Sequence, residues 1–427
     1  MVGMSSNQVA LLLFDLAFIL VLAHGLGHLA TRIGQPPVVG EILAGVLLGP
    51  TLLNGAVSDT LFPHTIRPLL SALADVGVTL FMFGVGLEIE RQALRGRGRM
   101  AAAVSLGSTA VPFVLGTGLG YFLLRNHETD QKAAFVVFIG LAVSVTAFPV
   151  LARILSDRGI TTTALGGIAL ATAALVDVVA WTALAGVQAA IGSAGSHWRV
   201  ALMIPFALVL VLVVRPWLRR RLTHGDGQGP VPAWWYAQVL IGALLCGAAT
   251  EAMGMHYIFG AFLFGVIMPS EGAERLRADL MQRTRTVTSV LLPVYFVVAG
   301  LKVDLRKFGW AETAELVAVL LVAVVGKFGG TYLGARSTGL PARPATALAA
   351  LMNTRGLTEL VILGVGLQAG LLDGGLYSLL VVMALVTTAM TGPLLKWTYA
   401  KPVIVPEATI REPGREPDRS SSATPVA

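Results

Sequence analysis

Charged residues are scarce in this sequence. Asp, Glu, Lys and Arg make up 13% of its 427 residues, while hydrophobic residues make up 55%. Water-soluble globular domains carry roughly 25% charged residues, so the composition excludes an ordinary soluble protein. It predicts a polytopic membrane protein, in which lipid replaces water around most of the chain.

Cysteine is almost absent as well. Cys246 is the single cysteine and lies in a hydrophobic run, which excludes disulfide bridges within the chain and thiolate metal sites. The net charge of +7 does not indicate nucleic-acid binding, because the arginines lie in short loops, where they orient membrane helices. We expect no nucleic-acid partner, no cofactor and no enzymatic activity.

Long hydrophobic runs dominate the sequence instead. A helix needs about 20 apolar residues to cross a bilayer core, and a window of that length predicts an all-α fold with about thirteen spans. The predicted spans are 8–32, 36–50, 66–88, 100–124, 132–156, 161–192, 198–214, 232–253, 256–269, 284–301, 312–334, 343–370 and 374–397.

The basic residues predict the orientation of these spans. Loops after odd-numbered spans hold most of the arginines, among them Arg91, Arg95, Arg219 and Arg220. Lys and Arg accumulate in cytoplasmic loops. We therefore expect a multi-pass protein of the plasma (inner) membrane with its N-terminus outside and its C-terminus in the cytoplasm.

The same pattern divides the chain. Residues 1–400 are expected to form one transmembrane domain with two halves, at about 8–192 and 232–397. Residues 401–427 are rich in proline, serine and charge. Such a tail has too little apolar surface to fold alone, so we expect a disordered cytoplasmic tail and no soluble regulatory domain in the chain.

One acid interrupts a hydrophobic run at its middle. Asp177 is the only charged residue between positions 164 and 192. A carboxylate near the midpoint of a spanning helix costs several kcal/mol and usually marks an ion or proton pathway. Asp177 is therefore the leading candidate for an ion- or proton-binding residue.

Two spans contain interruptions at comparable depth. In span 132–156, Pro149 removes a backbone donor, and Ser144 and Thr146 offer hydroxyl groups nearby. In span 343–370 the interruption consists of four consecutive residues, Asn353, Thr354, Arg355 and Gly356. Because the spans are seven apart, they cross the membrane in opposite directions, as inverted repeats with broken helices require. The alternative is an ordinary proline kink with a polar helix contact.

Three more charges lie toward the middle of predicted spans, whereas other charges lie closer to span ends. Lys327 falls in span 312–334, and Arg355 and Glu359 fall in span 343–370. Together with Asp177 they have no net charge, which indicates mutual pairing. We expect them to support the site electrostatically, while a static buried network is an equally good interpretation of Arg355 and Glu359.

Several segments also carry a resemblance to a known family. They are QPPVVGEILAGVLLGP (35–50), FMFGVGLEIE (81–90), SVTAFPVLARIL (144–155), ALVDVVAW (174–181), TEAMGMHYIFGAFLFGVIMP (250–269), PVYFVVAGLKVDL (293–305), GKFGGT (326–331) and MNTRGLTEL (352–360). Together they resemble the second family of monovalent cation:proton antiporters, which includes bacterial Na+/H+ and K+/H+ exchangers.

This resemblance implies a thirteen-helix protomer that forms a homodimer. A scaffold domain would make the dimer contact, and a core domain would hold two crossed broken helices. The resemblance further implies that Asp177 binds the ion, that Ser144 and Thr146 help to coordinate it, and that Lys327 faces the site. The ligands of Na+ or K+ would include Asp177 and Thr146.

The chain departs from the family pattern at one position. Many relatives have an acid or an amide immediately before the aspartate, where this sequence has Val176. Valine can neither ligate a cation nor pair with Lys327, so we expect electroneutral exchange of one cation for one proton.

The residues themselves predict alternating access. A bare carboxylate is costly in the membrane interior, so a proton or an alkali cation must neutralise Asp177 before the site changes faces. Three other classes stay open: a gated K+ efflux channel-like protein, a non-transporting ion-sensing receptor on the same fold, and an intramembrane aspartyl protease with Asp177 and Glu359. His24 and His28, four residues apart, suit metal binding or pH sensing, with packing as the alternative.

Overall fold

The computed structural model describes residues 6–51, 55–63, 65–88, 98–127, 129–161, 163–191, 202–223, 232–269, 273–306 and 308–398. Within these ranges the chain is helical and contains no strand. The predicted disordered tail at 401–427 and the arginine-rich loop at 89–97 lie outside the described residues.

The helices follow the hydrophobic runs along the chain. They are α1 (Ser6–Arg32), α2 (Pro37–Leu48), α3 (Ala56–Leu61), α4 (Arg67–Glu88), α5 (Gly98–Leu123), α6 (Lys132–Ser144), α7 (Phe148–Asp157), α8 (Ala164–Ile191), α10 (Met203–Val209), the π-helical turn η2 (Leu210–Val214), α11 (Arg215–Thr223), α12 (Ala233–Ala252), α13 (Tyr257–Ile267), α14 (Glu274–Gly300), α15 (Trp310–Ser337), α16 (Ala342–Met352), α17 (Leu357–Gln368) and α18 (Gly374–Thr398).

These helices confirm an all-α, multi-pass membrane protein. In the described part of the chain, seven helical segments are long and apolar enough to cross a membrane, or eight if the bent pair α16–α17 is one span. The apolar helices α2 and α13 are shorter. Each predicted span coincides with a helix or a helix pair, but length and apolarity do not establish all thirteen as crossings.

Several helix boundaries differ from the sequence prediction, and α11 carries the helix of the predicted span 198–214 on to Thr223. The short helix α3 (Ala56–Leu61) lies in a segment predicted to be a loop. Helix α14 begins at Glu274, ten residues before the predicted start. Its charged first turns lower the local hydropathy but still suit a helix, because Arg283 pairs with Asp279 one turn earlier at 2.8 Å.

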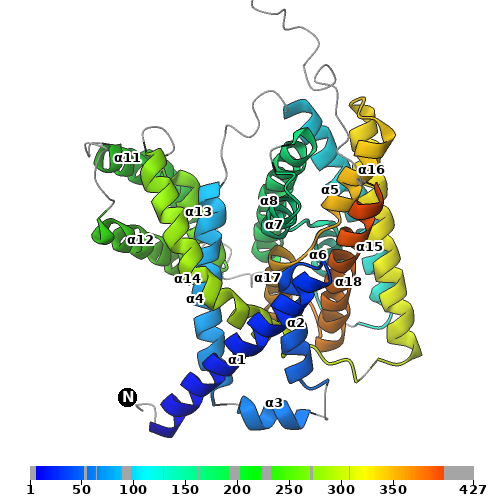
Figure 1. Ribbon diagram of the computed structural model, residues 1–427, viewed down its shortest axis with the longest axis horizontal. Coiled ribbons are helices and arrows are strands. Elements are labelled where there is room, and N and C mark those ends of the chain that lie inside the picture. Colours follow the sequence, from blue (N-terminus) through cyan, green and yellow to red (C-terminus); the bar gives the residue numbers. More distant parts are fainter. Residues whose placement is uncertain are drawn as a thin grey trace, which may run out of the picture.

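The helices pack as two groups; in Figure 1, α4 and α12–α14 lie on the left and α5, α15 and α16 on the right, while α1 runs across to α2 near α18. We call α1, α2, α4, α12, α13 and α14 the scaffold group, and α5–α8 with α15–α18 the core group. The main contacts of each helix lie inside its own group. Between the groups, the main contacts are those of α14 with α17 and of α2 with α18.

The core group contains the same arrangement twice. A long helix, a broken pair and a second long helix follow each other as α5, α6–α7 and α8, and again as α15, α16–α17 and α18. The breaks lie at Val145–Ala147 and at Asn353–Gly356, and the second pair is bent by 43°. Both predicted breaks are thus present, and they lie in corresponding positions of the two repeats.

Glycine fixes the distance between α5 and α15. A Cβ atom on Gly330 would overlap the backbone oxygen of Gly107, so the two helices touch through their backbones here. Lys327, one turn before Gly330, is completely buried. The close packing therefore brings a lysine on α15 against the backbone of α5.

Candidate functional site

The two helix breaks contact each other directly. The backbone N–H of Ala147 donates to the carbonyl of Thr354 at 3.0 Å. The Thr146 hydroxyl donates to the carbonyl of Met352, the last residue of α16, at 2.9 Å. Backbone groups freed by one break are therefore satisfied by the other, as membrane depth requires.

Gly356 permits this crossing. A side chain at position 356 would place its Cβ atom 2.7 Å from Cγ2 of Val150 on α7, and the glycine φ is +156°. Both the space and the backbone conformation therefore disfavour any larger residue.

Asp177 lies on α8, which packs against α5, α6, α7 and α16. The residue is 1% exposed. Neither carboxylate oxygen has a hydrogen-bond partner among the described residues, although the backbone amide of Phe148, at the start of α7, lies close by. A buried carboxylate without a donor is costly to the fold, so a ligand must supply what the protein does not.

Lys327 does not pair with this carboxylate. Its Nζ donates to the backbone carbonyl of Ser108 at 2.9 Å and to that of Ser144. The lysine attracts Asp177 electrostatically, yet no ion pair joins the two in the described part of the chain. Lys327 therefore binds the C-terminal end of α6 directly and influences Asp177 only through electrostatic attraction.

Arg355 binds the same helix end from the other repeat. Its Nη1 donates to the carbonyl of Ala142 at 2.9 Å, and its Nη2 donates to that of Val143. Nη1 also contacts Oε1 of Glu359 at 3.1 Å, and both side chains are fully buried. This geometry favours the static network for Arg355 and Glu359.

Together the two cations neutralise the carbonyl end of α6. The last four carbonyls of a helix lack backbone partners within the helix, and this end carries partial negative charge. The Ser144 hydroxyl donates to the carbonyl of Leu141, and Lys327 and Arg355 supply donors to the other three, those of Ala142, Val143 and Ser144. Sequence reasoning identified both charges but not this shared role.

The remaining predicted site residues are polar oxygens near the breaks. The hydroxyls of Ser144 and Thr354 donate to carbonyls in the preceding turn, at 2.9 and 2.7 Å. Their oxygen lone pairs stay available. Asn353 donates to the carbonyl of Thr387 at 3.4 Å, while its Oδ1 is buried without a partner. Carboxylate, hydroxyl and amide oxygens are hard ligands of the type that alkali cations accept.

The two histidines of α1 are not part of this centre. His24 and His28 are exposed, and Nδ1 of His24 lies 2.8 Å from the carbonyl of Leu20 on its own helix. Among the described residues, no three His, Cys, Asp or Glu side chains form a group that would hold a metal ion.

Sequence reasoning missed a cluster of one histidine and two acids in the core group. It lies just after α5, near the start of α15 and just before α18. Nδ1 of His127 contacts Asp373, and Nε2 lies 3.1 Å from Glu315. Asn126 donates to the other Glu315 oxygen at 2.6 Å. The hydrogen bond with Asp373 raises the pKa of His127 to about 9, and Glu315 adds to this effect. No local pattern predicts the cluster, because its members lie far apart in sequence.

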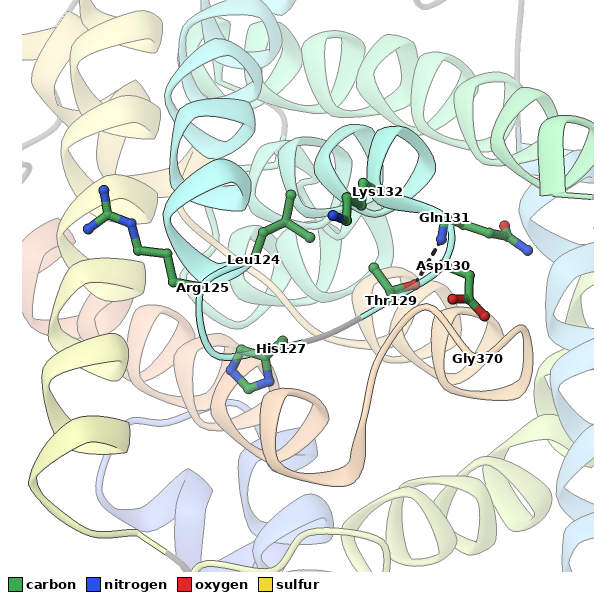
Figure 2. A pocket seen from close by; sticks show the side chains of 8 residues that line it. All are labelled: Leu124, Arg125, His127, Thr129, Asp130, Gln131, Lys132 and Gly370. Carbon is green, nitrogen blue, oxygen red and sulfur yellow. Dashed lines mark hydrogen bonds between the residues drawn. The ribbon is translucent and has the colours of Figure 1, made fainter.

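A surface pocket adjoins this cluster. The pocket has a volume of about 650 Å³ and is lined by the connection between α5 and α6 and by Gly370; Figure 2 shows the lining side chains. Its lining includes Arg125, His127 and Asp130, whereas Asp177 is not among the lining residues. The pocket is therefore separate from the crossing of the broken helices.

Comparison with known families and proteins now adds to this geometry. The family described as "Sodium/hydrogen exchanger, transmembrane" matches residues 17–401. The chain is 37% identical to the Na(+)/H(+) antiporter NhaS4 of Synechocystis over 413 residues, which cover 93% of this chain and all of that protein.

Eukaryotic relatives are similar over part of their length. The chain is 36% identical to Cation/H(+) antiporter 20 of Arabidopsis thaliana and 31% identical to K(+)/H(+) antiporter 1 of Saccharomyces cerevisiae, over 91% and 92% of this chain. It spans about half the length of each, 48% and 47%.

A solved structure shares the fold. The sodium proton antiporter MjNhaP1 of Methanocaldococcus jannaschii superposes with a TM-score of 0.68 at 14% identity, covering 92% of this chain and 97% of that one. At this identity the likeness shows a common fold and nothing further about the site.

Proposed function

The chain belongs to the sodium/hydrogen exchanger family, and on that premise we propose that it exchanges Na+ or K+ for H+ across the plasma membrane by alternating access. Asp177 binds the cation and the proton in turn. The names of the relatives, which are Na(+)/H(+), K(+)/H(+) and cation/H(+) antiporters, support exchange over a channel or a receptor.

One observation carries this proposal: the carboxylate of Asp177 is buried and has no hydrogen-bond partner among the described residues. An unneutralised charge is costly inside the membrane. Loading with one proton or one alkali cation removes that cost, so the loaded site changes faces more readily than the empty one. Because the empty, charged site changes faces less readily than the loaded one, movement of the cation is coupled to movement of the proton, and uncoupled leak of either ion is suppressed.

The surroundings of Asp177 support a stoichiometry of one cation for one proton. Val176 is 1% exposed and offers no ligand. Lys327 is bound to backbone carbonyls and does not share a proton with a second carboxylate. Glu359, the other buried acid near the crossing, is paired with Arg355, so Asp177 alone carries one cation or one proton, and the exchange is electroneutral.

Thr146, Ser144 and Asn353 are the side chains that would complete the coordination of the cation with Asp177. Their oxygens belong to the two breaks or flank them, and Oδ1 of Asn353 has no donor. We further propose a homodimer formed by the scaffold group, with the N-terminus outside and the C-terminus in the cytoplasm.

The test compares wild type with Asp177→Asn in proteoliposomes that carry an imposed pH gradient. Addition of Na+ or K+ is expected to dissipate the gradient through wild type and not through the variant. Clamping the membrane potential is expected to leave the wild-type rate unchanged. A variant that is as active as wild type would refute Asp177 as the site, and a rate that follows the potential would refute one-for-one exchange.

A matched control is Asp59→Asn on α3. Asp59 is a surface acid whose side chain is 68% exposed and which pairs with Arg67 at 2.7 Å. Its loss removes the same charge without touching the crossing, so transport is expected to stay at the wild-type rate.

A further inference from the structure

A second carboxylate lines a cavity between the scaffold and core groups. The cavity has a volume of about 90 Å³, enough for several water molecules. Its scaffold side comes from α4, α13 and α14 and the residue Lys302 just after α14, and its core side comes from α17 and α18. Figure 1 shows α17 between α14 and α18, and these helices are in contact.

Asp75 is the acid in this cavity. It is half-buried on α4, and its Oδ1 accepts a hydrogen bond from the Tyr257 hydroxyl at 2.8 Å. No donor to Oδ2 is found in the described ranges. One oxygen is thus held by the scaffold, while the other is available to a cation in the cavity.

Lys302 lines the same cavity and modulates this acid. The lysine and Asp75 attract each other electrostatically. They form no ion pair in the part of the chain that the structure describes, so the second oxygen of Asp75 stays available to a cation. The lysine lowers the local negative potential without blocking the carboxylate.

The position of the cavity connects it to the crossing. Its core wall includes Val361 and Gly364 of α17, the helix that begins beside the second break at Gly356. Val361 lies five residues from that break, or about 7 Å along a helix. The cavity therefore reaches to within about two helical turns of the second break, and Asp177 is not among its lining residues.

The cavity also lies at a defined membrane face. Asp75 is eight residues from the start of α4, about 12 Å along the helix, whereas the other end of α4 leads to the arginine-rich loop at 89–97. In the proposed orientation the cavity opens to the outside. Three hydrogen bonds join the groups at this end: from Tyr377 to the carbonyl of Ala299 at 3.1 Å, from the Asp304 amide to Ser378 at 3.0 Å, and from the His256 amide to Gln188 of α8 at 3.2 Å.

We propose that this cavity is the outer vestibule of the exchanger and that Asp75 is its capture site for a hydrated alkali cation. This inference rests on the proposed cation/proton exchange. Asp75 concentrates cations at the outer entrance, Lys302 limits how tightly they are held there, and Asp177 alone carries them between faces. A carboxylate at an entrance raises the local concentration of cations through its electrostatic field.

Kinetics from each side of the membrane test this role. In right-side-out vesicles, Asp75→Asn is expected to raise the KM for the outer cation by about threefold or more while leaving the maximal rate unchanged. In everted vesicles its KM is expected to equal that of wild type. Lys302→Gln is expected to lower the outer KM, because it removes a repelling charge.

Asp59→Asn is the matched control, since it removes an acid from the same face outside the cavity. An equal shift in this control, or an equal shift of Asp75→Asn in both vesicle orientations, would overturn the proposal. Asp177→Asn separates the two ideas: if it abolishes transport while Asp75→Asn behaves as wild type, exchange stands and the vestibule fails.

Chemical labelling gives a second readout that needs no transport. In a Cys246→Ala background, Ser71→Cys places a thiol in the cavity, and Ser105→Cys places one in the buried interface of α5 with α8. A membrane-impermeant thiol reagent added outside is expected to label the first and not the second. Absence of labelling at position 71, or labelling only from the cytoplasmic face, would refute an outer vestibule.

Discussion

Asp177 and Lys327 are both fully buried charges, but the protein treats them in opposite ways. The lysine has two carbonyl acceptors, whereas the carboxylate has no donor that forms a hydrogen bond. Removing a satisfied group leaves its partners unsatisfied, and removing an unsatisfied group relieves a cost. The two residues should therefore have opposite effects on stability.

For Asp177→Asn we expect loss of transport together with a higher Tm in detergent without added cation. The amide is neutral, so the desolvation cost of an unpaired carboxylate disappears, a cost of about 1–3 kcal/mol or more for a charged group. Thermal unfolding of both proteins, followed by tryptophan fluorescence, measures this change. A Tm below that of wild type would contradict this prediction, because it would show that hydrogen-bond donors stabilise the Asp177 carboxylate in the folded protein.

For Lys327→Met we expect the reverse effect on stability. The methionine fills a similar volume but leaves the carbonyls of Ser108 and Ser144 without donors, at about 1–3 kcal/mol for each buried group. The Tm in the same assay is expected to fall. Lys302→Met serves as the control, because Lys302 lies at a helix end and has no such carbonyl acceptors among the described residues. An unchanged Tm in Lys327→Met would contradict the role of the lysine at the end of α6.

Among the elements, the crossing of α6–α7 with α16–α17 depends on one close approach. Gly356→Ala is expected to reduce both Tm and transport, because the new methyl group would overlap Val150. The double variant Val150→Ala/Gly356→Ala should recover part of both, since the shorter side chain makes room. A double variant no better than the single one would assign the effect to the glycine φ of +156° alone.

The sequence predicted those features of the helices that depend on neighbouring residues, namely their hydrophobic runs and the residues that interrupt them. Pro149 and the run from Asn353 to Gly356 predicted both breaks, and the hydrophobic runs predicted the helices. The start of α14 was predicted ten residues late, because its charged first turns resemble a loop in a hydropathy window. The position of α3 was missed for lack of a long apolar run.

Contacts between distant elements could not be predicted in the same way. Arg355 was expected to pair with Glu359, four residues further along the chain, and it does. Its bonds to Ala142 and Val143 cross more than two hundred residues, and no periodicity encodes them. The roles of Ser144 and Thr146 toward a cation stay predictions from the family resemblance.

At the scale of the whole molecule, His127 joins the two repeats. It lies after α5 and contacts Glu315 of α15 and Asp373 before α18. Since both ring nitrogens face carboxylates, the protonated imidazolium is the form that donates to both. The histidine therefore links the repeats most strongly when it is charged.

This link should make stability depend on pH. The folded pKa of His127 is about 9, above roughly 6.5 in an unfolded chain. A raised pKa means that the stabilisation is fully present below about 6.5 and is lost as pH rises through about 9. Wild type is expected to lose Tm across this window relative to His127→Ala, measured in detergent at fixed ionic strength. Parallel Tm curves for the two proteins would contradict the link.

The donors at the end of α6 come from the protein itself, from one lysine and one arginine, and not from the cargo. When the cation leaves, those carbonyls keep their partners, so the vacated centre is preorganised for the next ion. The reorganisation energy between loaded and empty forms is then small at this helix end. In the proposed mechanism, the cost of the empty form then lies in the charge of Asp177 and not in local refolding of the crossing.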